Sequence, residues 1–396
     1  MSGHSVVHTP VGGRIMTGTM KVLLTIVALS GIVVAIRFLQ GIAAVSNLSN
    51  GYPWGVWIAI DVVVGTAIGC GGFAVGILVY ILNKGKYHPL VRPAVLTSLL
   101  GYGLAVIAVT IDLGRYWGLP KVPIFVWRWT HSPQLEVALC VTAYVMVLLI
   151  EISPAAFEKW KDSKNPTLRS LSTSGMRIMD KILLWVLALG LLLPAMHQSS
   201  LGTMMLLPGP KVHPLWFTPW LPFLFLVNCI MIGYAVVVLE ANFSSRAFGR
   251  PSERPMLASL SKVAAWVALF WGVFRLGEVA IAGELGLIAT GKGMFFLAEV
   301  VLVLLAAAIL FSEKNRNNPT WQVRAALIML VGGALHRVNT YLIAFDPGAN
   351  YHYFPSVPEL LITFGIIAAE VAIYIAVVKT FPILGGHGPG PARSKA

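Results

Sequence analysis

Ten apolar stretches, each long enough to cross a lipid bilayer, constrain the fold of this chain more than any other feature. A helix needs about 20 apolar residues to span the hydrocarbon core. Because backbone groups in lipid must be hydrogen-bonded within their own segment, we expect each stretch to be a helix. We place the spans at residues 22–45, 54–82, 94–112, 134–153, 178–197, 217–240, 262–281, 293–311, 322–344 and 359–380. The expected fold is an all-α integral membrane protein with about ten transmembrane helices.

The composition excludes a soluble globular protein, because 57% of the residues are hydrophobic and only 11% are charged. We expect one polytopic membrane domain over residues 1–396, with tails at 1–20 and 381–396. Cys70, Cys140 and Cys229 stand singly in apolar spans. They are too few and too scattered for an iron-sulfur cluster or a disulfide framework, so we interpret them as packing residues.

The distribution of Lys and Arg predicts the orientation in the membrane. An even number of spans puts both termini on one side, and that side carries 21 of the 29 basic residues, against five on the opposite side. The positive-inside rule therefore predicts cytoplasmic termini in a bacterial inner membrane. Contact with the anionic lipid bilayer also accounts for the net charge of +13, so no nucleic-acid partner is needed.

Ionisable residues within the spans gather in the outer half of the membrane. A charge at membrane depth is costly and is by default paired or functional. Arg275 and Glu278 are three residues apart and form a candidate ion pair, for which simple structural pairing is an equal alternative. The layer as a whole indicates a site for a polar-headed ligand or for protons. Its members are Arg37, Asp61, Asp112, Glu136, His197, Arg275, Glu278, Glu299, His336, Arg337 and Glu359.

A quinone suits such a layer, because it enters from the lipid and its reduction consumes protons. Residues 134–153 offer a proton track, since Glu136, Cys140, Tyr144 and Glu151 fall roughly on one helical face. We assign proton transfer to Glu136 and Glu151; the alternative for Glu151 is an inner glutamate facing basic loops. Glu240, for which the same alternative holds, and Glu370 are the other deep acids, as the sequence places them.

Two further patterns concern helix packing and haem. Gly65, Gly69, Gly72 and Gly76 form a small-residue stripe that predicts close approach of another helix. His197 and His336 are the only histidines at membrane depth. One haem held by this pair is an alternative that would show a visible absorption band on reduction, but we expect no haem and no metal site.

The two long outward connections, residues 113–133 and 198–216, are rich in Trp, Pro and His. An interfacial aromatic belt is one interpretation of this composition. A docking surface for a water-soluble partner is the other. The residues concerned are Trp117, Trp127, Trp129, His131, His213 and Trp216.

Several long motifs resemble the NrfD/polysulfide-reductase family of membrane subunits. They are GYPWGVWIAID at 51–61, YHPLVRP at 87–93, IDLGRYW at 111–117 and MHQSSLG at 196–202, followed by KVHPLW at 211–216, YFP at 353–355 and ELLI at 359–362. Within the family, they most closely resemble the HybB-type subunits of periplasmic nickel-iron hydrogenases. The resemblance covers roughly residues 46–380 and is weaker in 241–262 and 281–322.

The resemblance implies a subunit without haem or iron-sulfur cluster, inactive alone, that passes electrons between a quinone, here expected to be menaquinone, and an outer ferredoxin-like iron-sulfur subunit. Through that subunit it would serve the large and small subunits of a nickel-iron hydrogenase, as the quinone-reducing part of an oxidoreductase complex. Proton translocation would accompany turnover if the protons come from the cytoplasm. On matching positions, the expected quinone-binding residues are Asp61, Asp112, Arg115, Tyr116, His197 and Gln198.

Two alternative functions remain, a subunit of a different respiratory complex and a transporter. A sulfite-reductase-linked or polysulfide-reducing complex uses a similar subunit and can oxidise quinol instead. A secondary transporter can also have ten helices and buried charges, but the sequence lacks an inverted repeat and paired broken helices.

Overall fold

The computed structural model describes residues 8–128, 130–250 and 253–385, and in these ranges it consists of helices and loops without a β-strand. Ten helical segments of the described chain are long and apolar enough to cross a membrane, which confirms the predicted number. Several predicted boundaries were wrong, among them those of the first and fifth spans. The first helix ends at Gln40, because Gly41 adopts a positive φ of 91°. The fifth is much longer than 178–197, because the polar residues before the apolar stretch continue the same helix.

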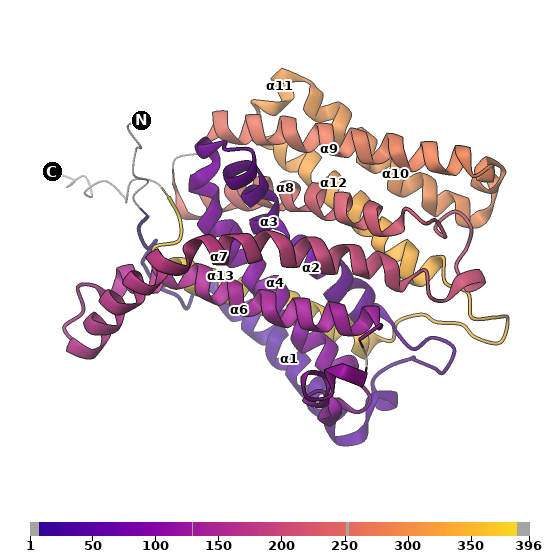
Figure 1. Cartoon of the computed structure of the whole chain (residues 1–396), viewed down its shortest axis with the longest axis horizontal. Helices are drawn as coiled ribbons and strands as arrows, with labels where there is room; N and C mark the ends of the chain where they lie inside the picture. The colour runs from indigo at the N-terminus through magenta and orange to yellow at the C-terminus, as the bar shows by residue number, and fades with distance from the viewer. Residues whose placement is uncertain (1–7, 129, 251–252, 386–396) are drawn as a thin grey trace.

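Figure 1 shows the order of these segments along the chain. The first and last are α1 (Gly18–Gln40) and α13 (Val357–Thr380). The second comprises η2 (Trp57–Val64), α2 (Gly65–Ile68), α3 (Gly71–Gly76) and η3 (Ile77–Ile81), and the third comprises η4 (Gly85–Leu90) and α4 (Val91–Asp112). The others are α6 (Pro133–Trp160), α7 (Pro166–Met204), α8 (Leu221–Phe248), α9 (Arg254–Ile281), α10 (Gly291–Phe311) and α12 (Pro319–Val338), which continues into η9 (Asn339–Ile343).

The helices form two neighbouring groups and a peripheral pair. The second span packs on α4 and touches α7, and α6 packs on both α4 and α7. The helix α8 packs with α9 and α12, between which α10 lies. The helices α7 and α8 join the two groups, while α1 and α13 pack on each other beside α4 and η2. The long axes of the helices run roughly from left to right in Figure 1.

The first and last described parts of the chain meet at one end of the bundle, on the left in Figure 1. The Thr9 amide donates to the Leu384 carbonyl at 3.3 Å and the Val11 amide to the Val378 carbonyl at 3.1 Å. The predicted tails 1–20 and 381–396 therefore meet where they are described. Residues 1–7 and 386–396 lie outside the described part of the chain. We call this end of the bundle the termini end and the opposite end the distal end.

The second span is approached closely on two sides, as its glycine stripe predicts. A Cβ atom on Gly101 of α4 would stand 3.1 Å from the Gly65 carbonyl oxygen and 3.3 Å from the Gly69 Cα atom. A Cβ atom on Gly233 of α8 would stand 2.7 Å from the Cys70 carbonyl oxygen. These contacts hold α4 and α8 against the second span, whose first segment, η2, carries Asp61.

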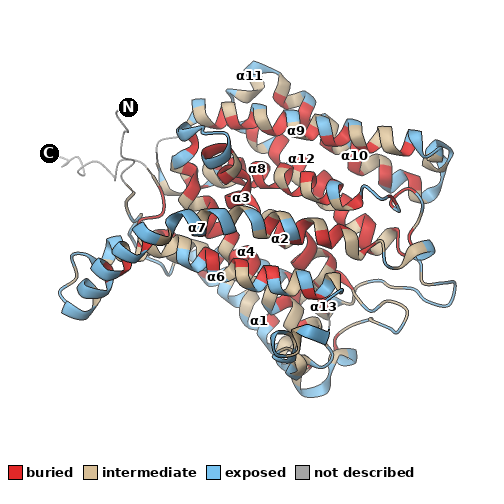
Figure 2. Ribbon diagram, in the orientation of Figure 1, coloured by how far each residue is buried: buried red, intermediate tan, exposed pale blue. Residues whose placement is uncertain are grey.

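Exposed apolar side chains cover the flanks of the bundle. Leu184 and Trp185 on α7 are 76% and 70% exposed, and Ile281 on α9 is 91% exposed. Figure 2 shows buried residues concentrated along the middle of the bundle. Large apolar side chains facing outward are expected where the solvent is lipid, and the chain is a multi-pass membrane protein.

Candidate functional site

The buried ionisable residues gather in the distal half of the bundle, because each lies near the appropriate end of its helix. Arg37 lies near the end of α1, Asp112 ends α4, and Glu359 begins α13. Arg337 lies in the last turn of α12, and Arg275 lies six residues before the end of α9. Of these five, all except the half-buried Asp112 are fully enclosed. The layer contains three groups of contacting side chains.

The first group surrounds Asp112, between α1, α4 and α13. The Arg37 guanidinium donates to the carbonyls of Ile111 and Leu113, each at 2.5 Å, and lies 5.5 Å from the centre of the Tyr116 ring. Asp112 interacts electrostatically with Arg37. One carboxylate oxygen of Asp112, Oδ1, is buried and has no hydrogen-bond partner within the described residues. A buried acceptor without a partner is unusual and marks this position as a candidate ligand contact.

The second span and α13 complete the wall of this group. The Thr363 hydroxyl donates to Asp61 Oδ2 at 2.8 Å. The Trp57 indole donates to the Glu359 carbonyl at 3.1 Å, and the Tyr353 hydroxyl donates to Glu359 Oε1 at 2.7 Å. Asp61 lies in the π-helical segment η2, and such segments are frequent at functional sites.

Tyr353 lies in the loop before α13 and keeps its proton. Burial, followed by its hydrogen bond to Glu359, raises the pKa of the Tyr353 phenol above its ordinary value. The hydroxyl is therefore a donor at every physiological pH. It also accepts from the Val56 amide at 2.7 Å, so it links the start of the second span to the start of α13.

The second group of side chains is built around His197 and lies among α4, α7 and the second span. His197 Nε2 and the Tyr102 hydroxyl are 2.7 Å apart, and His197 Nδ1 lies 2.8 Å from the Leu193 carbonyl. The Gln198 amide donates to Thr66 Oγ1 at 3.1 Å and to the Tyr102 hydroxyl at 3.2 Å. His197 and Gln198 are fully buried. Tyr102 was missed by sequence reasoning, and its only signal was a phenol in the middle of an apolar span.

The third group of side chains centres on the Glu299 carboxylate of α10, the helix that lies between α9 and α12. Arg275 Nε is 3.5 Å from Glu299 Oε1, and His336 Nδ1 is 3.1 Å from the same oxygen. Asn339 and the Trp216 indole donate to Glu299 Oε2 at 2.9 and 3.2 Å. The structure also shows the ion pair between Arg275 and Glu278. This carboxylate thus has charged and polar partners on both oxygens.

Arg337 connects the two groups of helices. Its guanidinium donates to the Val63 carbonyl of η2 at 2.9 Å, to the Phe225 carbonyl of α8 at 2.8 Å and to Asn228 Oδ1 at 2.7 Å. Arg337 is fully buried. One side chain therefore fixes α12 against α8 and against the π-helical segment that carries Asp61.

The structure separates the six expected quinone-binding residues. Asp61, Asp112 and Tyr116 border the distal end between α1, α4 and α13, where Arg115 is exposed. His197 and Gln198 belong to the buried group around Tyr102. The six residues therefore belong to two groups of contacting side chains.

The predicted proton track on α6 is not continuous. Cys140 and Tyr144 are buried, but Glu136 is exposed on the outside of the bundle. Glu151 lies beside Gly190 of α7 near the termini end. The four residues share a face only roughly, because the helical advance over 15 residues rotates the ends of the series away from each other.

The two long distal connections differ in what they expose. Trp117 and Trp127 are each 63% exposed, as an aromatic belt or a docking surface requires. Trp216 is fully buried, so its expected surface role was wrong; the reason is its hydrogen bond to Glu299. His213, in the same connection as Trp216, is half-buried. This burial is the main cause that lowers the pKa of its imidazole. Trp129 lies outside the described residues.

The two buried histidines belong to separate clusters. Both ring nitrogens of His197 lie within hydrogen-bond distance of protein atoms, Tyr102 and Leu193, so neither nitrogen is free to bind a haem iron. His336 Nδ1 lies 3.1 Å from Glu299, and its Nε2 atom is buried without a hydrogen-bond partner within the described residues. Within residues 8–128, 130–250 and 253–385, no group of three His, Cys, Asp or Glu side chains could hold a metal ion.

The sequence of the chain matches a known protein family and several known proteins. Residues 44–344 match the family model described as "Polysulphide reductase, NrfD". The chain is 37% identical, over 95% of its length and 94% of the relative, to the "Probable Ni/Fe-hydrogenase 2 b-type cytochrome subunit" of Escherichia coli K12. It is 28% identical, over 78% of its length and 76% of the relative, to the "Menaquinone reductase, integral membrane subunit" of Nitratidesulfovibrio vulgaris Hildenborough. A second protein of that bacterium is 31% identical over 95% of both chains.

Proposed function

Because the chain belongs to the NrfD family of polysulphide-reductase membrane subunits, and is a quinone-linked respiratory membrane subunit, we propose that it reduces menaquinone. The electrons come from an iron-sulfur subunit bound at the distal end. The reaction adds two electrons and two protons to the quinone and yields the quinol. The chain binds the quinone and supplies the protons, while the iron-sulfur partner supplies the electrons.

The buried, unpartnered Oδ1 atom of Asp112 is the observation that carries this proposal. A protonated Asp112 can donate a hydrogen bond, and then a proton, to a quinone carbonyl oxygen. Arg37 and Tyr116 lie beside it, and Asp61 lines the same side of the bundle. Arg37 balances the negative charge that develops on the oxygen as electrons arrive.

The remaining expected residues support this position without contacting the head group. His197 and Gln198 are held by Tyr102 and Thr66, and so position the second span from its other side. Arg115 is exposed at the rim, where it can guide the head group from the lipid interface. We propose that neither haem nor an iron-sulfur cluster is held by this chain.

The proposed partner is a ferredoxin-like iron-sulfur subunit that connects to a nickel-iron hydrogenase. The 37% identity to a nickel-iron hydrogenase subunit over nearly the whole of both chains supports this choice. The exposed Trp117 and Trp127 supply an aromatic surface at the distal end. The second candidate is an equivalent subunit of a sulfite- or polysulfide-linked complex that oxidises quinol, which the family description favours.

The first prediction concerns Asp112→Asn, which keeps the shape of the side chain but removes its titratable proton. In membranes that contain the whole complex, we expect hydrogen-dependent reduction of a short-chain menaquinone analogue to fall at least tenfold. Hydrogen-dependent reduction of a water-soluble dye, which takes electrons before the membrane, should be unchanged.

The control is Glu313→Gln, at an exposed position in the short helix α11 (Glu313–Arg316). This variant should behave as the unmodified complex. Full quinone reduction by the Asp112→Asn complex would refute the assignment of Asp112. An unmodified complex that reduces no quinone with hydrogen, but reduces polysulfide with a quinol, would establish the second candidate.

A further inference from the structure

A stripe of polar side chains runs along α13 for most of the membrane thickness. Glu359, Thr363, Glu370 and Tyr374 are separated by four, seven and four residues, so they lie roughly on one face of the helix, with the two ends of the series rotated by about 60°. Fifteen residues at 1.5 Å each span about 22 Å. Glu359 and Thr363 are buried, and Glu370 and Tyr374 are half-buried. The stripe therefore faces the bundle, while the other faces of α13 are apolar.

At the termini end the stripe meets a cavity. The Tyr374 hydroxyl donates to Glu240 Oε1 at 2.6 Å, and the Thr97 hydroxyl donates to Glu240 Oε2 at 2.9 Å. Glu240, Ser244, Arg250 and Glu253 are among the residues that line a cavity of about 60 Å³. This volume holds a few water molecules, and the polar lining offers them hydrogen bonds.

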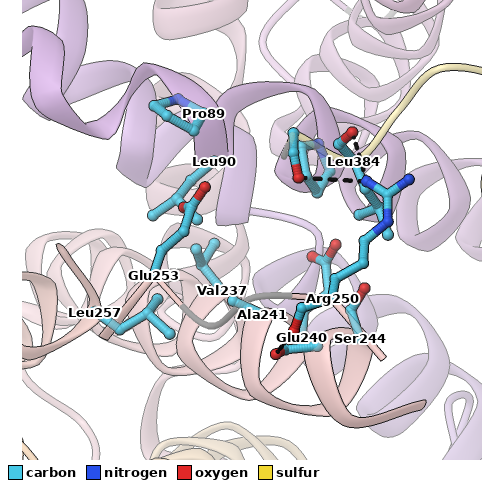
Figure 3. A pocket seen from close by; sticks show the side chains of 13 residues that line it. Pro89, Leu90, Val237, Glu240, Ala241, Ser244, Arg250, Glu253, Leu257 and Leu384 are labelled. Atoms are coloured by element: carbon cyan, nitrogen blue, oxygen red, sulfur yellow. Dashed lines mark hydrogen bonds between the residues drawn. The ribbon is translucent and has the colours of Figure 1, made fainter. Parts of the chain in front are cut away.

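Figure 3 shows how the cavity relates to the termini end. Glu240 and Ser244 project from α8, and the Arg250 guanidinium donates to the Leu384 carbonyl at 2.9 Å. Burial raises the pKa of Glu253, on the opposite wall, above its ordinary value. The cavity thus places titratable groups between the chain ends and the deep carboxylate of Glu240.

Glu370 bridges the gap between the two halves of the membrane. On α13 it stands four residues from Tyr374, which donates to Glu240, and seven residues from Thr363, which donates to Asp61. Asp61 in turn is hydrogen-bonded to Thr363, one turn from Glu359, and Glu359 interacts electrostatically with Asp112. The series connects the cavity at the termini end with the group at the distal end.

The absence of cations distinguishes this series from a structural ion-pair network. Within the described residues, no salt bridge reaches Asp61, Glu240 or Glu370. The buried Glu299, by contrast, is paired with Arg275 and His336. A membrane-embedded carboxyl group without a cation is costly when charged, so groups of this kind are suited to bind and release protons.

We propose that Glu240, Glu370 and Asp61 form a proton route from the cavity at the termini end to the Asp112 group. This inference rests on the proposed quinone reduction, which consumes two protons for every two electrons from the iron-sulfur partner. Each carboxyl group accepts a proton from the side of the cavity and passes one on toward Asp112, and thus regains its original state. Electrons then enter from the distal face and protons from the face with the termini, so turnover separates charge across the membrane.

The test uses closed vesicles that contain the whole complex with the termini end inside and a trapped pH-sensitive dye. Hydrogen and a menaquinone analogue start turnover, and quinone reduction and internal pH are recorded together. In the unmodified complex we expect the interior to become alkaline. Glu370→Gln should lower the rates of both quinone reduction and internal alkalinisation at least tenfold, and Glu370→Asp, which keeps a titratable group, should restore a large part of both. Glu313→Gln serves as the matched control, since it removes an exposed carboxylate.

Each outcome decides the proposal. Unchanged rates and unchanged internal alkalinisation in Glu370→Gln would overturn the route but leave quinone reduction intact. Proton uptake from the external medium alone, in the unmodified complex, would overturn it in the same way. Failure of the unmodified complex to reduce quinone would overturn both proposals. If Glu370→Gln does not assemble, Tyr374→Phe takes its place, because it removes only a hydroxyl group. A Tyr374→Phe complex that takes up protons at the rate of the unmodified complex would count against the route.

Discussion

At the scale of single residues, burial and partners divide the ionisable groups into two classes. Glu299 has an Arg, a His, an Asn and a Trp around it. Asp112 has one buried oxygen without a partner in the described chain. The first class is satisfied within the protein and stabilises the fold, whereas the second has capacity for a ligand or a proton. The identity of a residue does not separate the classes, because both contain carboxylates at the same depth.

Glu299 provides the second prediction, because its charge is fully compensated. Glu299→Gln removes the negative charge beside Arg275 and His336 and leaves Glu278 as the one remaining anionic partner of Arg275 within the described residues. Breaking a buried pair in this way typically costs about 3–5 kcal/mol. We expect a marked loss of thermal stability in detergent and a lower yield of folded protein, while Glu313→Gln should unfold at the temperature of the unmodified chain. An unfolding temperature unchanged by Glu299→Gln would show that the cluster does not stabilise the fold.

At the scale of elements, small residues decide how closely helices approach. The second span touches α4 through Gly65, Gly69 and Gly101 and touches α8 through Gly233. This proximity lets Arg337 reach the Val63 carbonyl from α12. A bulkier residue at any of these contacts would move the segment with Asp61 away from its neighbours.

The third prediction follows from two glycines of α4 that lie two residues apart. In Gly101→Leu, the first side-chain atom already meets the backbone of Gly65 and Gly69 at 3.1 and 3.3 Å. Overpacking of this kind typically costs about 1–3 kcal/mol, so we expect a lower unfolding temperature and less monodisperse protein in detergent. Gly103→Leu is the matched control, because a Cβ atom there has no neighbour within 4 Å. Equal stability of the two variants would contradict close packing of α4 on the second span.

At the scale of the whole molecule, the two groups of helices carry different buried polar clusters at the same depth. The His197 cluster lies in the first group and the Glu299 cluster in the second. The Asp112 group and the α13 stripe lie between the first group and the peripheral pair, α1 and α13. The peripheral pair is thus where the candidate quinone position and the candidate proton route meet.

The fourth prediction concerns the orientation of the molecule. Most Lys and Arg residues outside the spans lie on the side of the termini, so we expect that side to face the cytoplasm. A fluorescent protein that folds only in the cytoplasm should fluoresce when it is fused after Ala396. Alkaline phosphatase, which is active only outside, should be active when inserted near Trp117. The opposite pattern would reverse the orientation and with it the direction of the proposed charge separation.

The sequence by itself determined the number of spans, their helical character and the family. These properties depend on local composition and on the thickness of the bilayer, and both can be read along the chain. Only the tertiary structure decided that Trp216 is buried against Glu299, that Glu136 faces outward, and that Tyr374 and Thr363 of α13 donate to Glu240 and Asp61. Depth follows from position along a helix, but partners follow from the rotation of each helix about its own axis, and packing against neighbouring helices sets that rotation.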